Sequence, residues 1–146
     1  MLNVIIRPAA ADDVNFIMSS YLRSLSNQAP YDLLDTNYFN ASGHLLANRI
    51  MAVSTIIMAC SSTDPSHIYG WIAGDKQKRT LHWVYVKNVF RHAGIGKMLM
   101  EALFEEYGAT AQKIRCTNWT RSMAFQDRKW NLYFDSYPLV LLARGE

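Results

Sequence analysis

Apolar residues change their spacing several times along this chain, and each change marks a predicted element. Residues 4–7 form a short apolar run closed by a proline, which predicts a first strand. Apolar side chains then recur every three or four residues over 14–25, as on one face of a helix, and Asp12 or Asp13 can cap its first amides. After a polar segment, a second helix is predicted over 40–52.

The middle of the chain predicts a meander followed by a helix. Residues 55–60, 68–73 and 80–90 are β-branched, aromatic or apolar runs separated by short polar turns. Three such runs predict consecutive antiparallel strands. From residue 95 the apolar spacing changes to that of a helix, which Gly108 is placed to end.

The last part of the chain predicts three further elements. Residues 113–119 indicate a strand, 121–130 a short helix, and 132–142 one or two closing strands. No repeat or linker interrupts the order, so we expect a single α/β domain with a mixed sheet over 1–146.

Composition narrows the class of protein. Among 146 residues, 50% are hydrophobic and 18% are charged, enough apolar surface to exclude general disorder. Cys60 and Cys116 are isolated in apolar runs, so we expect buried thiols of a reducing compartment and no metal site. We also expect neither a signal peptide nor a membrane span, hence a cytoplasmic protein, and the net charge of +3 disfavours nucleic acid as a partner.

Positive charge gathers in one stretch. From Lys76 to Met100 there are six basic residues and no acidic one. Within it, Gly94 and Gly96 join a predicted strand to a predicted helix. Unpaired amides and the partial positive charge at a helix start favour phosphate oxygens, and Arg91 beside them adds a full charge. This turn is therefore a candidate diphosphate site, while a tight turn without a ligand remains the alternative reading.

Two nucleotide-binding patterns with similar glycines do not fit. The Rossmann pattern needs a third glycine where Leu99 stands, and the Walker pattern needs serine or threonine where Met98 follows Lys97.

Segment 91–96, which reads Arg-His-Ala-Gly-Ile-Gly, instead resembles the motif Arg/Gln-x-x-Gly-x-Gly/Ala of the GNAT superfamily of acyl-CoA-dependent N-acyltransferases. The resemblance implies an α/β (α+β) GNAT-like single domain, with a central mixed, twisted sheet of six to seven strands flanked by about four helices. It implies acetyl-CoA as cosubstrate and a thioester that enters between two splayed strands, here 80–90 and 113–119. The residues implied to contact CoA are Val84, Tyr85, Val86, Arg91, His92, Ala93, Gly94, Ile95, Gly96, Lys97 and Asn118.

The catalytic residues depart from the family pattern. Arg128 stands where the family has its proton-donating tyrosine, and Tyr133 is the candidate substitute. The family's usual basic glutamate is absent, so His82, with an ordinary pKa near neutrality, is the candidate general base. Strand alternation would place His82 on the face of Val84 and opposite Tyr85. An exposed strand histidine without a catalytic role stays open.

The resulting expectation is an enzyme that moves an acetyl or related acyl group from acyl-CoA to a primary amine of a small molecule or peptide, by direct attack in a ternary complex. The alternative is a catalytically weak or inactive acyl-CoA-binding module of the same fold. An acyl-enzyme on Cys116 is disfavoured, because no base is visible beside it. Membranes are not expected as partners, and a homodimer is left open.

Overall fold

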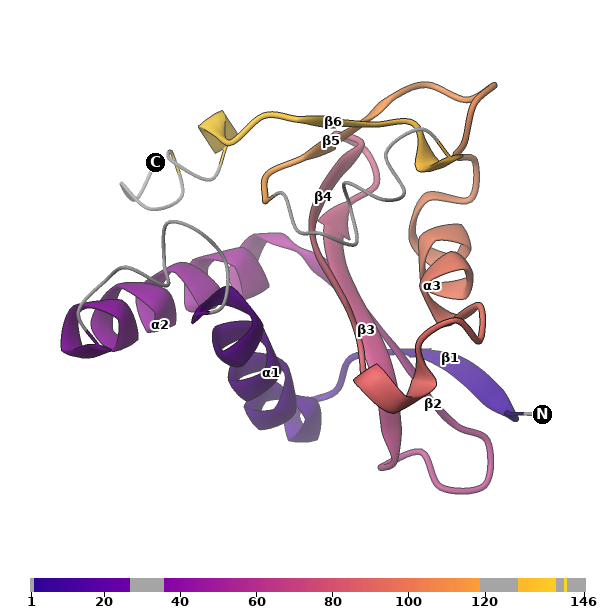
Figure 1. Cartoon of the computed structure of the whole chain (residues 1–146), viewed down its shortest axis with the longest axis horizontal. Helices are drawn as coiled ribbons and strands as arrows, with labels where there is room; N and C mark the ends of the chain where they lie inside the picture. The colour runs from indigo at the N-terminus through magenta and orange to yellow at the C-terminus, as the bar shows by residue number, and fades with distance from the viewer. Residues whose placement is uncertain (1, 27–35, 119–128, 139–140, 142–146) are drawn as a thin grey trace.

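The computed structural model describes residues 2–26, 36–118, 129–138 and 141. Its elements follow the predicted order (Figure 1), and they are β1 (Val4–Pro8), a 3-10 turn (Ala11–Asp13), α1 (Val14–Ser26), α2 (Thr36–Val53), β2 (Thr55–Ser61), β3 (Ile68–Asp75), β4 (Thr80–Val86), a second 3-10 turn (Asn88–Phe90), α3 (Ile95–Phe104), β5 (Ile114–Cys116) and β6 (Leu132–Phe134). The described part of the predicted single α/β domain therefore holds three α-helices. Most of the helix predicted over 121–130 lies outside the described residues.

The described strands form one six-stranded sheet in the order β1-β2-β3-β4-β5-β6. Strands β1 to β4 pair antiparallel, which confirms the predicted meander, whereas β4 with β5 and β5 with β6 pair parallel. The sheet is therefore mixed, as expected.

Helices cover both faces of the sheet, α1 and α2 on one and α3 on the other (Figure 1). Side chains of β3 alternate between the two cores: Ile72 packs in the cluster with α3, whereas Trp71 and Ala73 pack in the cluster with α1 and α2. The central strand β3 therefore buries both of its faces, one under α3 and the other under α1 and α2.

Several predicted boundaries are wrong. The strand expected over 80–90 ends at Val86, because Lys87 makes the last bond to β3 and the chain then enters the second 3-10 turn. Helix α3 ends before Gly108, because Glu105 takes a φ of 61°. Of the one or two closing strands expected over 132–142, the described residues form one, Leu132–Phe134.

A buried ion pair fixes the entry to α1. Asp13 is 4% exposed. Its carboxylate accepts hydrogen bonds from Nη1 and Nη2 of Arg7, at 2.6 and 2.9 Å, and from the backbone amide of Ala10, at 2.7 Å. Arg7 also donates to the carbonyl of Pro65, at 3.0 Å, so one side chain joins β1 to the β2–β3 turn. The hydrogen bonds from Arg7 are the main cause of the lowered pKa of Asp13.

We expect Asp13→Asn to lower the free energy of unfolding by about 2 kcal/mol at pH 7, since charge-assisted hydrogen bonds are lost around a buried group. The folded pKa lies below the unfolded value, so this contribution is present above the unfolded pKa and disappears as pH falls through the folded one. Urea unfolding at pH 7 and at progressively lower pH measures the difference. Exposed Asp12 provides the control, and an equal loss in Asp12→Asn would contradict the assignment.

Candidate active site

The turn before α3 has the geometry of an anion site. Gly94 is the residue before the helix and has a φ of 81°, a left-handed conformation that glycine adopts without strain. Its carbonyl accepts the amide of Met98, at 3.1 Å. The amides of residues 95–97 come before the Met98 amide, which is the first to donate within the helix, and the first turn contains no acidic residue. These amides can therefore receive phosphate oxygens.

Basic side chains surround this turn. Arg91 is exposed, and its Nε donates to the carbonyl of Val86, at 3.1 Å, which turns the guanidinium back along the end of β4. Lys97 is exposed, and its Nζ lies 4.0 Å from Oε1 of Glu101, one helical turn away. His92 is exposed and has a φ of 68°. The positive charges predicted for the diphosphate site thus lie at one end of β4 and α3.

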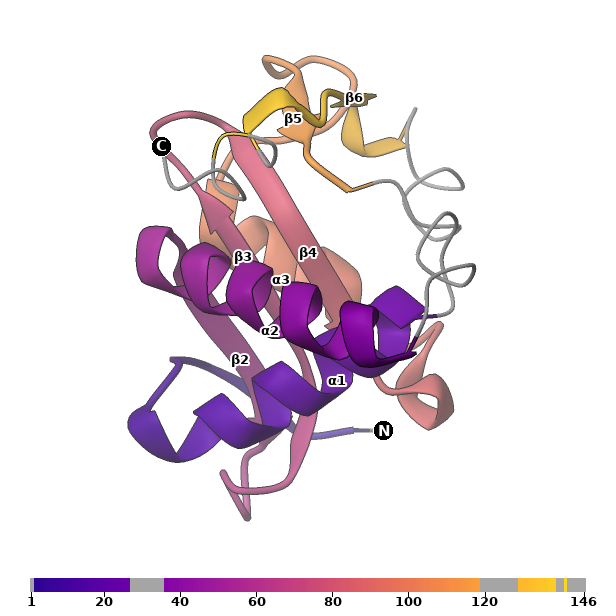
Figure 2. The same ribbon diagram turned by 90° about the vertical axis from the view of Figure 1, so that its left-hand side faces the viewer.

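The second feature is a parting of β4 from β5. The two strands pair only at Thr80 with Arg115 and Leu81 with Cys116. Beyond that pair β4 continues to Val86, whereas β5 ends, and Figure 2 shows β5 beside only the beginning of β4. Among the described residues, which stop at Asn118 after β5, the later part of β4 therefore has no ladder partner on this side, where the family resemblance implied that the thioester enters.

Backbone groups of β4 face this opening. The Lys87 amide donates to the carbonyl of Tyr69 on β3, at 2.8 Å. Because alternate residues of a strand turn their amides and carbonyls to opposite edges, those of Val84 and Val86 face away from β3. The Arg91 bond to the Val86 carbonyl agrees with this direction. The peptide groups predicted to pair with pantetheine amides are thus turned toward the gap, and the intervening Tyr85 is turned toward β3.

A β-bulge corrects the predicted direction of His82. Ala73 pairs with Trp83 but Gly74 pairs with Leu81, so β4 holds one extra residue, His82, opposite β3. Leu81 consequently packs in the same cluster as Val84, contrary to simple alternation. His82 lies on the opposite face, where its Nδ1 is 2.8 Å from the hydroxyl of Thr117. Sequence periodicity cannot locate a bulge, because the extra residue is itself compatible with a strand.

The environment of His82 also differs from expectation. The side chain is 5% exposed, which rules out the exposed strand histidine. Burial lowers the pKa of His82 to about 4, with a smaller opposing effect from the charge of Asp75. The expectation that His82 titrates near neutrality is therefore wrong, and the imidazole is neutral at pH 7.

Thr117 and Asn118, directly after β5, bond to β4 at the point where the described pairing of the two strands stops. We call this point the vertex. The Asn118 amide nitrogen donates to the carbonyl of His82, at 3.1 Å, and Thr117 donates its own amide to the carbonyl of Leu81, at 3.1 Å. Asn118 is buried and bridges the two strands, whereas the family resemblance implied only that it contacts CoA. Thr117 was missed, although a polar pair ending an apolar strand was a usable signal.

Tyr133 lies on β6, the strand that pairs with β5. It pairs in register with Arg115, and its hydroxyl accepts the Arg115 Nε at 3.2 Å. Tyr133 is 38% exposed, and β5 separates it from His82. The two candidate catalytic side chains therefore lie on neighbouring parts of the sheet without direct contact. Position 128, where the family has its tyrosine, is outside the described residues.

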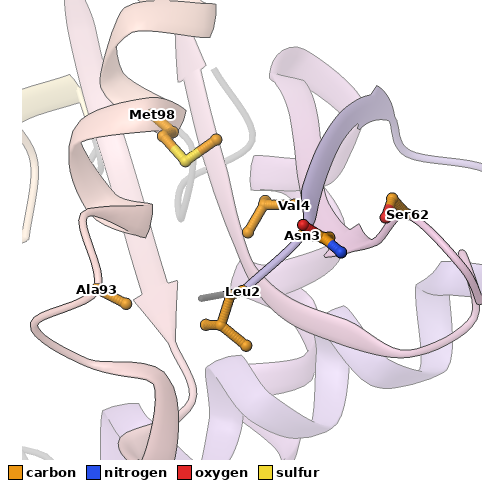
Figure 3. Close-up of a pocket in the computed structure, with 6 residues that line it drawn as sticks. All are labelled: Leu2, Asn3, Val4, Ser62, Ala93 and Met98. Atoms are coloured by element: carbon orange, nitrogen blue, oxygen red, sulfur yellow. The ribbon is translucent and has the colours of Figure 1, made fainter.

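A separate open pocket of about 640 Å³ lies on the β1 side of α3 and is lined by Leu2, Asn3, Val4, Ser62, Ala93 and Met98 (Figure 3). Ala93 belongs both to this pocket and to the turn before α3. The parted strands lie on the other side of α3, toward β5. Backbone donors and acceptors of Val84 and Val86 face away from β3 on that side, whereas four of the six residues lining the pocket are apolar.

The described part of the chain lacks two other kinds of feature. No group of three or more histidine, cysteine, aspartate or glutamate residues there is arranged to hold a metal ion. None of its helices combines the length and apolar character needed to span a membrane.

The chain's fold is similar to that of solved structures, although no model of a known protein family and no curated protein matches its sequence. Apo YjaB from Escherichia coli aligns with a TM-score of 0.52 and 15% identity over 71% of this chain and 66% of its own. A GCN5-related N-acetyltransferase from Rhodopseudomonas palustris aligns with a TM-score of 0.49 and 13% identity, covering 72% and 66% of the two chains. PaiA N-acetyltransferase from Thermoplasma acidophilum, in complex with coenzyme A, aligns with a TM-score of 0.47 and 16% identity, covering 69% of each chain.

These likenesses concern the fold alone. The chain shares its α/β fold with apo YjaB, and two of the other structures that it resembles are described as N-acetyltransferases, the class of protein that segment 91–96 resembles. The first of these matches spans just under two thirds of the solved chain.

Proposed function

We propose that this protein binds acyl-CoA and transfers an acetyl or related acyl group to a primary amine by direct attack. The observation that carries the proposal is that, among the described residues, β4 pairs with β5 only at its beginning, beside the turn that starts α3. The turn after β4 would then offer phosphate ligands, and the later part of β4 would offer peptide groups that no described strand pairs. The beginning of β4, where the described pairing with β5 stops, would lie at the thioester. A ligand with a diphosphate, two amides and a thioester in series matches that order.

CoA binding is supported residue by residue. Amides 95–97 and the charges of Arg91 and Lys97 would hold the diphosphate, with His92 and Ala93 forming the approach to the turn. The peptide groups of Val84 and Val86 would pair with the pantetheine amides. Tyr85 differs from these two residues: its peptide group is turned toward β3, and its ring centroid lies 6.1 Å from that of Phe16. The contact to CoA that the resemblance implied for Tyr85 is therefore not part of the proposed set.

Direct attack needs no enzyme nucleophile. The amine nitrogen forms a bond to the thioester carbon, the carbon–sulfur bond breaks, and the amine loses one proton while the departing thiolate gains one. Cys116 is fully buried, and burial raises the pKa of its thiol to about 12, so it is not a thiolate at pH 7. This supports a ternary complex over an acyl-enzyme on that residue.

His82 and Tyr133 are our candidates for the proton transfers. When the Nδ1 proton of His82 is donated to Thr117, its Nε2 has a free lone pair that can orient the amine and relay its proton to water. Tyr133 accepts a bond from Arg115 and keeps its own O–H proton, which it would donate to the thiolate. Asn118 acts as a positioning residue, because it ties the His82 carbonyl to β5.

We expect CoA to stabilise the protein by about 2.7 kcal/mol at 100 times its dissociation constant. Calorimetry and thermal unfolding measure binding, and release of free thiol from acetyl-CoA with a panel of amines and peptides measures transfer. No binding at millimolar CoA would overturn the proposal. Binding without thiol release from any acceptor would instead favour the inactive acyl-CoA-binding module.

A further inference from the structure

Arg115 is a charged side chain in an unusual place in the sheet. Its neighbours Ile114 and Cys116 are both 0% exposed and pack in the cluster under α3. Because alternate side chains of a strand point to opposite faces, Arg115 lies on the face of α1 and α2. Figure 2 looks onto that face. There α1 and α2 cross in front of β2, β3 and β4, whereas β5 and β6 lie outside the area that these helices cover.

The Arg115 guanidinium is held in one orientation. Its Nε donates to the hydroxyl of Tyr133, at 3.2 Å, and lies 3.8 Å from a carboxylate oxygen of Asp135. The other Asp135 oxygen accepts the amide of Tyr137, at 3.0 Å, which fixes the carboxylate in turn. Both interactions engage the Nε side of the guanidinium. Among the described residues, its outer edge, formed by the two Nη nitrogens, has no hydrogen-bond partner.

This outer edge belongs to the vertex of the splayed strands. Arg115 pairs with Thr80, directly before the last pair between β4 and β5. Thr117, two residues later and therefore on the same face, bonds to the His82 ring. Two residues along a strand span about 7 Å. A molecule that reaches the thioester from this face therefore passes a fixed guanidinium.

We propose that Arg115 is an acceptor subsite that binds a carboxylate, so that the acceptor is a primary amine that also carries a carboxylate group. This rests on the proposed acyl transfer. A planar guanidinium edge with two donors matches the two oxygens of a carboxylate. Tyr133 and Asp135 set the orientation before the ligand arrives, which reduces the ordering needed on binding.

Paired acceptors with the same amine test this subsite: 4-aminobutyrate against 4-aminobutyramide, leucine against leucinamide, and 3-aminopropylphosphonate as a third anion. We expect a carboxylate to raise kcat/KM by about 10- to 100-fold over its amide, the range of a charge-assisted hydrogen bond. Arg115→Gln should remove this preference and Arg115→Lys should keep only part of it. Lys113→Gln removes an exposed charge nearby and should leave the preference intact.

A second measurement is independent of turnover. The Nε–H resonance of Arg115 should shift on titration with 4-aminobutyrate in the presence of CoA, and thermal stabilisation by CoA should confirm that each variant is folded. Transfer without any preference for carboxylates would overturn the subsite while the proposed function stands. A shifted resonance without transfer would retain the subsite and overturn the function. A preference for the phosphonate over carboxylates would overturn the assignment of carboxylate.

Discussion

Gly94→Val should abolish most of the stabilisation that CoA gives. Gly94 has a φ of 81°, and no other atom lies within 4 Å of an added Cβ, so the penalty is one of backbone conformation rather than of space. A left-handed conformation costs an ordinary residue roughly 1–2 kcal/mol and a β-branched one more, so the turn should rearrange. If the dissociation constant rises 100-fold, the stabilisation at the same ligand concentration falls from about 2.7 to about 0.4 kcal/mol.

Gly108→Val is the matched control. Gly108 also has a positive φ, of 110°, but it lies beyond the other end of α3, and an added Cβ would meet only the Lys129 carbonyl at 3.5 Å. This variant should lose stability and keep CoA affinity.

Gly96→Glu tests charge at the same turn. An added Cβ at Gly96 would meet the Trp130 ring at 3.4 Å, an ordinary contact, so the new carboxylate should act mainly by repelling phosphate. Ala102→Glu adds the same charge at an exposed position later in α3 and should bind CoA normally. Full affinity in both Gly94→Val and Gly96→Glu would place the diphosphate elsewhere.

The order of strands and helices is predicted well from the sequence, because local patterns of apolar and polar residues determine it. The meander of β2, β3 and β4 follows from apolar runs broken by polar turns, and the anion turn follows from two glycines before an amphipathic helix. That β4 and β5 pair only at the beginning of β4, among the described residues, was available only through the family resemblance, since no local pattern encodes where parallel strands stop pairing. Helix and strand ends were the least accurate, as Glu105 illustrates by ending α3 with a positive φ.

The chemistry of the vertex was beyond the sequence for a different reason. One extra residue in β4 reverses the face on which His82 lies, and the partner that buries it, Thr117, is 35 residues away. Burial then lowers the pKa of the imidazole. The pattern of residues along a strand reveals neither the bulge nor how deeply a side chain is buried. Together these two features change the proposed role of His82 from a titrating base to a neutral relay.

The neutral state of His82 predicts a distinctive acid dependence of stability. Its folded pKa of about 4 lies below the ordinary histidine pKa of 6.5, so the unfolded chain binds more protons between these two values. The free energy of unfolding should therefore fall as pH decreases from about 6.5 to 4, by on the order of 3 kcal/mol from this residue. His82→Gln should lose this dependence in urea unfolding series. His67→Gln, at an exposed position, should retain it.

His82→Ala should lower kcat/KM for amine acetylation by roughly 100-fold, since a positioned proton acceptor typically contributes on that order. CoA affinity should change little, because the diphosphate turn lies at the opposite end of β4. The kcat/KM of the wild type should show no inflection from an imidazole near pH 6.5, and its acidic limb should follow the pKa of the acceptor amine instead. An inflection near pH 6.5 that disappears in His82→Ala would show that His82 titrates as an ordinary exposed base, and would overturn the neutral relay. Rates equal to wild type in both His82→Ala and Tyr133→Phe would remove both residues from the mechanism and leave positioning between the parted strands as the source of catalysis.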